Sequence, residues 1–494
     1  MKFYLLLGFI LVILIGTSLA QNVETGNVEA FKQALEQDGF TVQEGQVGFL
    51  DFLKLYDTGV MPSAYGNNPT TRYLVYFVPP APGYTVDKVM SEHSKVLVSN
   101  GNITPVWNLR PDEAIIFVGR TPPECRYFNF DPTLQFRTYG NERRWPCTPV
   151  GDTLNMANIK TEGTPDGQAG NPFNQTTMII HTADKGIDQR IHLAAESAGY
   201  SNEIINTMVF PAPMLHMGLK NESDSLCVYI RPALYTDKQA GNDYLNKTPA
   251  IILRATPNKT TELDPYDVPK EKVRGTGTTE FELMDDVEEL RKAILDRYSD
   301  LNATELPTSQ WYPNANEGFQ KGISIYGPTH DACYLWTEDQ TLSVQTPPFN
   351  DVWETYPFLR DAEVILGNDT NEFVILYGVN HVATGKATYQ NIGIFGAKAW
   401  NGVGAITDVS LNGTAEAYLP NNPNAKYLYV YKIARNCVGD PHCYEVPSDM
   451  GAWGIDLNDP IMIAFRIYFE PSTEVGPSYD EIMWDKAIDF NPKE

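Results

Sequence analysis

The apolar positions in the first half of the chain alternate between helical and strand periods. Apolar residues recur at helical spacing over 23–39, 85–98 and 184–198. Dense apolar runs, which are typical of strands, cover Tyr73–Val78, Glu113–Val118, Thr177–His181, Ile204–Phe210, Cys227–Ile230 and Ala250–Leu253. In chain order these segments twice read strand, helix, strand, and that order predicts small α/β units.

Breaks in this pattern divide the chain. Residues 21–254 are expected to form an α/β-type N-terminal half, with a subdomain break near 137–172 where turn-forming residues accumulate. Residues 255–280 are polar, charged and interrupted by prolines, a composition that predicts a linker. Because domains usually hold about 100–200 residues, a chain of 494 residues should form two or three.

Strands dominate the remaining residues, 281–494. A single helix is predicted at Phe281–Tyr298, where apolar residues at helical spacing cover one face. The clearest strands are Lys426–Ala434 and Ile461–Tyr468, which are rich in aromatic and β-branched residues. We therefore expect an α+β fold: strand–helix–strand units in the N-terminal half, and a β-rich C-terminal half, sandwich-like or a mixed sheet, supported by disulfides.

One short pattern occurs twice in the C-terminal half. Ile325-Tyr-Gly-Pro-Thr-His330 recurs as Leu376-Tyr-Gly-Val-Asn-His381, and each copy follows an apolar run. A degenerate third copy lies at 115–121. The pattern predicts two equivalent strands of a duplicated unit, each of which ends at a glycine and a loop that presents a histidine.

The two histidines are the candidate catalytic residues. His330 is followed by Asp331, and His381 is followed a few positions later by Lys386, so the four side chains could act as acid and base or bind a metal. In the alternative interpretation, each histidine only caps its strand by bonding backbone groups. Phosphate-loop, dinucleotide, EF-hand and zinc-protease motifs are absent, so no cofactor is expected.

The first twenty residues have the features of a secretory signal peptide. Lys2 supplies a positive charge, residues 3–16 are almost wholly apolar, and Ser18-Leu19-Ala20 resembles a cleavage site before Gln21. The alternative is an uncleaved anchor, but the apolar core is shorter than the ~20 residues of a spanning helix. The mature protein is thus expected to be secreted or held at the cell surface, with no membrane span.

Six cysteines in an exported chain favour disulfides. Cys437 and Cys443 enclose a short loop and are the predicted pair. A metal clip that adds His442 is the alternative, but it lacks the usual fourth ligand. The other cysteines leave the connectivity open, with Cys125–Cys147 as a guess from proximity: Cys125, Cys147, Cys227 and Cys333.

Sequons and charge also bear on the partners. A net charge of −25 with no basic cluster disfavours nucleic acid. Asn-x-Ser/Thr sequons, which mark exposed loops that a glycosylating host would modify, occur at Asn102, Asn174, Asn221, Asn246, Asn258, Asn302, Asn368 and Asn412.

Two functional hypotheses follow. The first is a secreted, glycosylated extracellular or cell-surface protein with a binding or structural role toward an unidentified extracellular partner. Carbohydrate is one such partner, since Trp311, Tyr312, Trp336 and Trp400 could stack on sugar rings. The alternative is a secreted hydrolase acting on a glycan or another polymer, with its site near the His330 and His381 loops.

The linker prediction can be tested by limited proteolysis. Under native conditions the first cut should fall within 255–280, because this segment has charge and proline but little apolar surface to bury. Mass spectrometry of the fragments locates the cut. First cuts elsewhere, with 255–280 intact, would show that the segment is not a linker.

Overall fold

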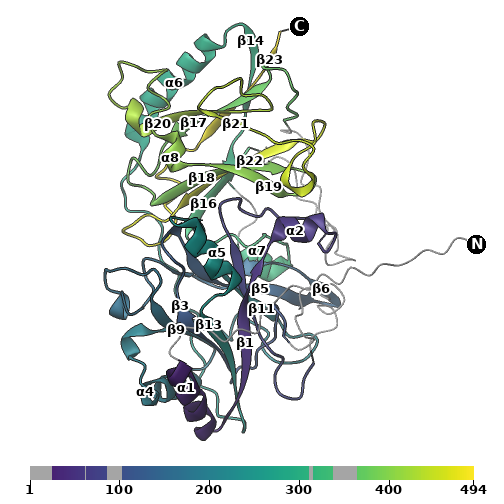
Figure 1. Ribbon diagram of the computed structural model, residues 1–494, viewed down its shortest axis with the longest axis vertical. Helices are drawn as coiled ribbons and strands as arrows, with labels where there is room; N and C mark the ends of the chain where they lie inside the picture. Colours follow the sequence, from purple (N-terminus) through teal and green to yellow (C-terminus); the bar gives the residue numbers. More distant parts are fainter. Residues whose placement is uncertain (1–24, 62, 86–102, 311–314, 338–363, 494) are drawn as a thin grey trace, which may run out of the picture.

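A computed structural model of the protein describes residues 25–61, 63–85, 103–310, 315–337 and 364–493. Strands account for 35% of the structure and helices for 18%. The N-terminal half, up to Pro257, is built around one large sheet, and the C-terminal half, from Phe281, around two smaller ones. The two halves are stacked end to end along the long axis of the molecule (Figure 1).

The large sheet of the N-terminal half curls into a half-barrel. Among the described strands β9 and β10 are its parallel pair, and its other neighbours run antiparallel. In order across the sheet the strands are β10 (Ile205–Val209), β9 (Thr176–Thr182), β3 (Ala114–Arg120), β13 (Ala250–Pro257), β1 (Phe40–Leu50), β2 (Tyr73–Phe77), β11 (Ser225–Ile230), β5 (Asn129–Tyr139) and β6 (Glu142–Arg144), with β7 (Thr148–Pro149) and β8 (Leu154–Asn155) beside β5. A separate pair is formed by β4 (Cys125–Tyr127) and β12 (Ala233–Tyr235).

The long strand β1 changes its partner along its length. Residues 40–45 pair with β13, and residues 46–50 pair with β2. Gly45 lies at the change of partner, where a Cβ atom would stand only 2.2 Å from the carbonyl oxygen of Phe77. Only glycine allows so close an approach of two backbones, so Gly45 permits the bend.

Helices α1 (Thr25–Gln37) and α4 (Lys185–Ser197) cover one face of the half-barrel. Helix α4 begins where the carboxylate of Asp184 accepts a hydrogen bond from the backbone N–H of Ile187. It ends before Gly199, whose φ is +91°. Alternate residues of β3 serve two cores: Ile116 packs under the helices, and Phe117 packs on the opposite face. Two shorter helices, α2 (Phe52–Asp57) and α5 (Lys238–Asn246), and the 3₁₀ turns η2 (Pro165–Gly167) and η3 (Asn202–Ile204) complete this half.

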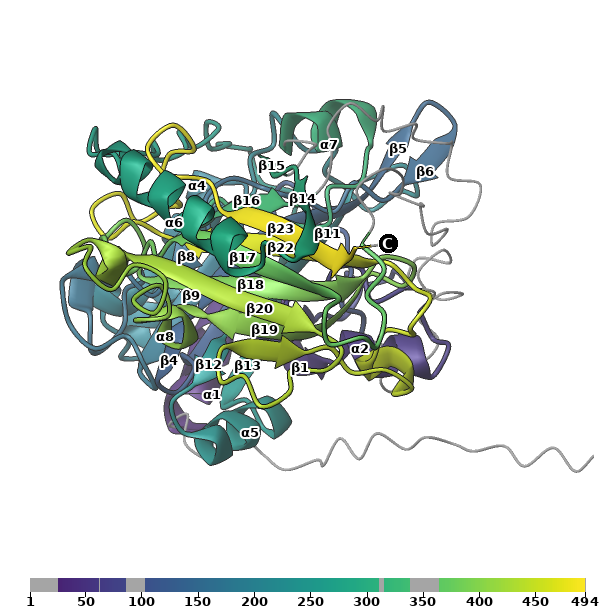
Figure 2. The same ribbon diagram turned by 90° about the horizontal axis from the view of Figure 1, so that it is seen from above.

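The C-terminal half is a sandwich of two sheets with an apolar core between them. One sheet has the order β14 (Leu301–Leu306), β23 (Lys486–Pro492), β17 (Phe373–Val379), β20 (Leu428–Ala434) and β21 (Cys443–Glu445). The other has the order β15 (Ser309–Gln310), β16 (Ala332–Trp336), β22 (Ile461–Tyr468), β18 (Tyr389–Gly396) and β19 (Asn401–Thr407). Helix α6 (Met284–Arg297), which follows η4 (Phe281–Leu283), covers the outer face of the first sheet (Figure 2). The remaining elements are α7 (Ala315–Lys321), α8 (Asp408–Leu411), η5 (Ala425–Tyr427) and η6 (Gly451–Trp453).

The expected α+β class, with strand–helix–strand units in the N-terminal half, is wrong, because the structure is mostly β-sheet. One such unit is present, β9–α4–β10, with its two strands parallel. The other does not form: β2 and β3 are not neighbours in the sheet. The strands β1 and β5 were not predicted, because glycines interrupt β1 and polar residues occupy alternate positions of β5. These polar residues are buried and paired, as described below.

The predicted duplication is also wrong. Residues 323–325 do not form a strand, and the chain after His330 enters β16 of one sheet. The second copy lies in β17 of the other sheet of the sandwich, and the degenerate copy lies in β3 of the N-terminal half. The similarity of the two segments therefore reflects no equivalent position in the fold.

The expectation of a disulfide-supported fold needs correction as well. Cys437 and Cys443 form a disulfide, as predicted. The other cysteines are buried free thiols, and the Cys125–Cys147 pair does not form: Cys125, Cys147, Cys227 and Cys333. Hydrophobic burial therefore holds most of the fold together, and the disulfide closes one surface loop.

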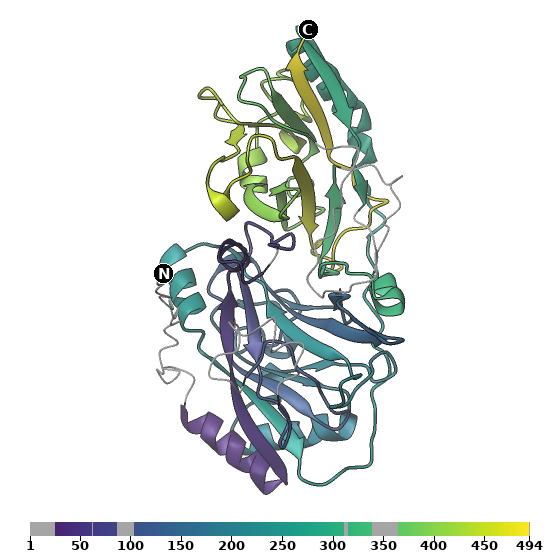
Figure 3. The ribbon, with the colours of Figure 1, turned by 90° about the vertical axis from the view of Figure 1, so that its right-hand side faces the viewer.

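The chain crosses between the halves through residues 258–280. Figure 3 shows this segment running along the outside of the molecule, and most of its residues up to 271 are exposed. Its last part is anchored in the C-terminal half, where Arg274 donates to the carbonyl oxygen of Ala332 at 3.0 Å. Within the described residues, no helix combines the length and apolarity that crossing a bilayer requires. The predicted signal peptide, the predicted helix at 85–98 and Asn102 lie outside the described residues, apart from Thr85 at the start of that helix.

Candidate functional site

The candidate Asp331 is buried where the two halves meet. Its carboxylate accepts hydrogen bonds from the hydroxyl of Tyr127, from Nδ2 of Asn129 at 3.2 Å, from Oγ1 of Thr153 at 2.6 Å and from Nδ2 of Asn155 at 3.0 Å. All four donors belong to the N-terminal half, and Asp331 is 1% exposed. A buried charge is stable only with such partners. Asp331 therefore joins the halves and is not open to a substrate.

His330, beside it, also contacts the N-terminal half. Its Nδ1 lies 2.5 Å from Oδ1 of Asp152. The other carboxylate oxygen of Asp152 accepts a hydrogen bond from the backbone N–H of Lys272 at 2.7 Å. His330 and Asp152 thus bind the C-terminal half and the connecting segment to the loop before β8.

His381 is fully buried between two carboxylates of its own half. Its Nδ1 lies 2.8 Å from Oε2 of Glu280, and its Nε2 lies 3.5 Å from Oδ2 of Asp485. Burial alone would lower the pKa of His381, but Glu280 and Asp485 raise it to about 10. The imidazole is therefore a buried cation at neutral pH, and a group with this pKa is a poor general base.

Lys386 is buried a few residues further on, with a different set of partners. Its ammonium group lies 2.7 Å from Oε1 of Glu470 and 2.6 Å from Oε2 of Glu481, and it donates to the carbonyl oxygen of Thr278 at 2.8 Å. Burial opposes the charged form, but the two carboxylates raise the pKa of Lys386 above its ordinary value. Lys386 thus fixes the end of the connecting segment to the sandwich.

The four candidates therefore have separate partners. Each is engaged in its own ion pair or hydrogen-bond network, and no contact between His330 and His381 is found in the part of the chain that the structure describes. In the same described part of the chain, no three or more His, Cys, Asp or Glu side chains are grouped so that they could hold a metal ion. The structure brings together His330 and Asp331 at the joint, but it does not combine them with His381 and Lys386 in one site.

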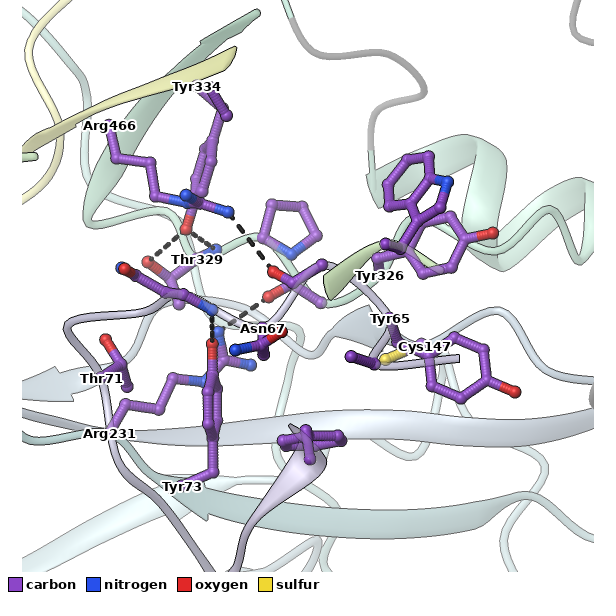
Figure 4. A pocket seen from close by; sticks show the side chains of 18 of the residues that line it. Tyr65, Asn67, Thr71, Tyr73, Cys147, Arg231, Tyr326, Thr329, Tyr334 and Arg466 are labelled. Carbon is purple, nitrogen blue, oxygen red and sulfur yellow. Dashed lines mark hydrogen bonds between the residues drawn. The ribbon is translucent and has the colours of Figure 1, made fainter. Parts of the chain in front are cut away.

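A cavity lies between the two halves, next to this joint. The space inside it that is open to the centres of water molecules is about 90 Å³. Tyr334 and Arg466 enter it from the C-terminal half, and Tyr73 and Arg231 from the N-terminal half on the opposite side (Figure 4). Tyr127, which donates to Asp331, is also in its wall. The joint and the cavity are therefore neighbouring parts of one interface.

Alternation along β22 explains how the C-terminal half forms its side of the cavity. Ile463, Phe465 and Ile467 point into the core of the sandwich. The residues between and beyond them point the other way and line the cavity: Met462, Ala464, Arg466 and Tyr468. Successive side chains of a strand point to opposite faces. One face of β22 is apolar and packs in the core of the sandwich, so Arg466, which lies on the other face, points toward the N-terminal half.

Strained backbone occurs in the wall of the cavity. Four non-glycine residues in its wall have positive φ angles: Tyr65 (+50°), Cys147 (+42°), Tyr326 (+56°) and Trp400 (+52°). Non-glycine residues adopt such angles rarely, and each costs on the order of 1–3 kcal/mol. Positions of this kind cluster at ligand sites, where the surrounding structure holds them in place.

The three aromatic side chains at these positions form an aromatic wall together with Trp145. The rings of Tyr326 and Trp400 are stacked, with centroids 5.0 Å apart and an angle of 23° between their planes. Tyr65 is stacked with Tyr326, with centroids 6.4 Å apart, and Trp145 meets Tyr65 edge to face at 4.8 Å. Tyr65 and Trp145 come from the N-terminal half, so the wall is completed only when the halves are joined.

Arg231 is the charged residue of the N-terminal side, and its charge is compensated. It pairs with the buried Asp131 at 2.7 Å and donates to the carbonyl oxygen of Gly327 at 2.8 Å. Burial raises the pKa of Asp131 to about 7, Arg231 opposes this rise, and Asp331 adds to it. Arg231 thus also connects the halves, through Gly327.

Few of the residues in the cavity wall carry a recognisable signal in the sequence. Of the aromatic residues proposed to stack on sugars, Trp400 lines the cavity, Trp336 is buried beside it, and Trp311 and Tyr312 lie outside the described residues. The repeated pattern does reach the site, but through Tyr326 and Thr329 rather than His330. A signal for Arg466 was present, namely a single arginine on one face of the predicted strand Ile461–Tyr468.

Comparisons with known proteins assign no family. No family model and no curated protein matches the chain. An uncharacterised protein from Burkholderia cenocepacia aligns with 10% identity over 94% of this chain and 86% of its own, at a TM-score of 0.35. A protein from Vibrio parahaemolyticus aligns with 11% identity over 94% of this chain and 100% of its own, also at 0.35.

The role of Asp331 predicts a large stability effect. Asp331→Asn should lower the free energy of unfolding by about 3 kcal/mol, because an amide cannot accept from all four donors and leaves buried polar groups unpaired. Chemical denaturation measures the change. The matched control is Asp300→Asn at an exposed position, which should change stability by less than about 0.5 kcal/mol. Equal losses of stability in the two variants would show that Asp331 does not stabilise the contact between the halves.

The buried charge of His381 predicts a pH dependence. The folded pKa, about 10, exceeds the unfolded value of 6.5. The stability that His381 contributes is therefore complete below about pH 6.5 and is lost as the pH rises toward 10. Wild type should lose on the order of a few kcal/mol over this range relative to His381→Gln. The control is His442→Gln, at an exposed position. Parallel pH profiles of wild type and His381→Gln would contradict the buried-cation assignment.

Proposed function

We propose that this protein is an exported binding protein that holds a small organic molecule in the cavity between its two halves. The observation that carries the proposal is the coincidence of the cavity with strained backbone at Tyr65, Cys147, Tyr326 and Trp400. Strain at aromatic residues lowers stability, so a fold keeps it where the placement of the side chains serves a function.

The shape and lining of the cavity suit a small ligand. Ligand sites are concave, mostly apolar, and often lie between domains. This cavity lies between the two halves and has a wall of tyrosine, tryptophan and phenylalanine rings with a few polar side chains. Rings fixed by mutual stacking lose little conformational freedom on binding, which favours affinity.

The chemistry of the wall favours binding over hydrolysis. Among the described residues, no carboxylate and no histidine lines the cavity, so the acid–base pair of a glycosidase is absent from it. Burial raises the pKa of the Cys147 thiol to about 12, which leaves almost no thiolate at neutral pH. The hydrolase hypothesis would need another site, and the loops of His330 and His381 supply no common one.

Export is supported by the sequence and by surface features. The predicted signal peptide directs secretion, and the disulfide Cys437–Cys443 suits an oxidising compartment. The described sequon asparagines are all exposed, as glycosylation requires: Asn174, Asn221, Asn246, Asn258, Asn302, Asn368 and Asn412. These features support export, and the cavity of an exported protein would meet extracellular solutes.

A thermal-shift screen tests the proposal. The mature protein is screened against sugars, organic acids, amines and neutral aromatic compounds. At least one class should stabilise it, by about 2.7 kcal/mol at a ligand concentration 100 times Kd. Ala464→Phe, which fills the cavity from β22, should abolish this shift.

The control is a cooperative unfolding transition of Ala464→Phe without ligand. The proposal fails if no class of compound raises the Tm of the wild type. It also fails if the folded Ala464→Phe variant responds as the wild type does.

A further inference from the structure

Arg466 has an unsatisfied charge in the cavity wall. The side chain is 9% exposed. Its Nη2 donates one long hydrogen bond, 3.4 Å, to the carbonyl oxygen of Gly66, and its Nη1 has no partner among the described residues. The guanidinium carbon lies 5.0 Å from the ring centroid of Phe395 and 5.9 Å from that of Tyr334. These rings orient the group but do not neutralise it.

The other buried arginines show what is missing at Arg466. Arg137 pairs with Asp224, Arg231 with Asp131 and Arg254 with Glu113. Arg435 has no such carboxylate, but it donates to four backbone carbonyl oxygens. Removal of a charge from water is unfavourable unless an opposite charge or several acceptors replace the water. Among these arginines, Arg466 alone has neither.

The composition of the wall makes the cavity positive. The chain carries 62 acidic and 37 basic residues, yet no carboxylate lines the cavity in the described part of the chain. Arg231 is paired with the buried Asp131, so Arg466 is the cation of the wall that has no carboxylate partner among the described residues. A concave, low-dielectric site with one uncompensated cation concentrates anions against the general repulsion of an acidic protein.

We propose that the ligand is an organic acid with a flat ring, and that its carboxylate pairs with Arg466. This inference rests on the proposed function, because it names the ligand class of the same cavity. A guanidinium binds a carboxylate through two parallel hydrogen bonds, and the guanidinium of Arg466, which lines the cavity, makes a single long hydrogen bond within the described part of the chain. The ring of the ligand lies against the aromatic wall of Tyr326 and Trp400, where edge-to-face and offset contacts between rings are favourable.

Calorimetric titration with matched probes tests this inference. The probes are 2-naphthoate, its neutral amide 2-naphthamide, and acetate, which has the carboxylate without the ring. Wild type should bind the acid on the order of tenfold to a hundredfold more tightly than the amide, because the hydrogen bonds involve two charges. Acetate should bind more weakly than 2-naphthoate.

Three variants locate the effect. Arg466→Gln should reduce the affinity for 2-naphthoate to that for 2-naphthamide and leave the amide affinity unchanged. Arg466→Lys should restore part of the preference, since it keeps the charge. Arg435→Gln, the matched loss of a buried arginine in the same half, should leave the acid-to-amide ratio of folded protein as in the wild type.

Several results would overturn the inference. One is an equal affinity of the wild type for acid and amide, and another is an unchanged ratio in Arg466→Gln. A third is binding of acetate as tight as that of 2-naphthoate, which would show that the ring of the ligand does not contribute to the affinity. If the wild type binds no probe while the thermal-shift screen finds a cavity ligand of another class, the anion assignment fails and the binding function stands.

Discussion

The carboxylate of Asp331 is the interaction on which the arrangement of the halves depends. It belongs to the C-terminal sandwich, but its four side-chain donors, on Tyr127, Asn129, Thr153 and Asn155, all belong to the N-terminal half. Separation of the halves would expose a network that is complete only when they are joined. Because a buried charge tolerates few alternative partners, this network fixes one relative orientation rather than a range of them.

The shape of the cavity depends on this joint. Tyr127 takes part in both, since it donates to Asp331 and lines the cavity. The stacked rings of Tyr65 and Tyr326 come from different halves, and so do the arginines on opposite sides. A site assembled in this way is formed before a ligand arrives, and preorganisation of this kind increases affinity. The strained backbone in the wall is therefore held by the same contacts that hold the halves together.

Local patterns in the sequence predicted single elements well. Residues 461–468 form the strand that their composition indicated, the helix at 184–198 lies where its period placed it, and the closest cysteine pair is bonded. Strand β5 was missed because alternation alone cannot distinguish solvated polar residues from buried ones. Asn129, for example, is paired with Asp331, which lies about two hundred positions later in the chain.

The candidate site could not be predicted for the same reason. His330, Asp331, His381 and Lys386 were chosen by proximity in sequence, but their partners come from other parts of the chain. The cavity joins short segments from both halves, and none of these segments carries a recognised motif. What the sequence did contain was an arginine on one face of an apolar strand, and its meaning required knowledge of what lies opposite that face.

A crystal structure of the protein grown with 2-naphthoate is the most direct test of this account. It should show the ring against Tyr326 and Trp400, and a carboxylate within hydrogen-bonding distance of Arg466. A cavity without the compound, or a guanidinium of Arg466 paired with a carboxylate of the protein itself, would contradict the account.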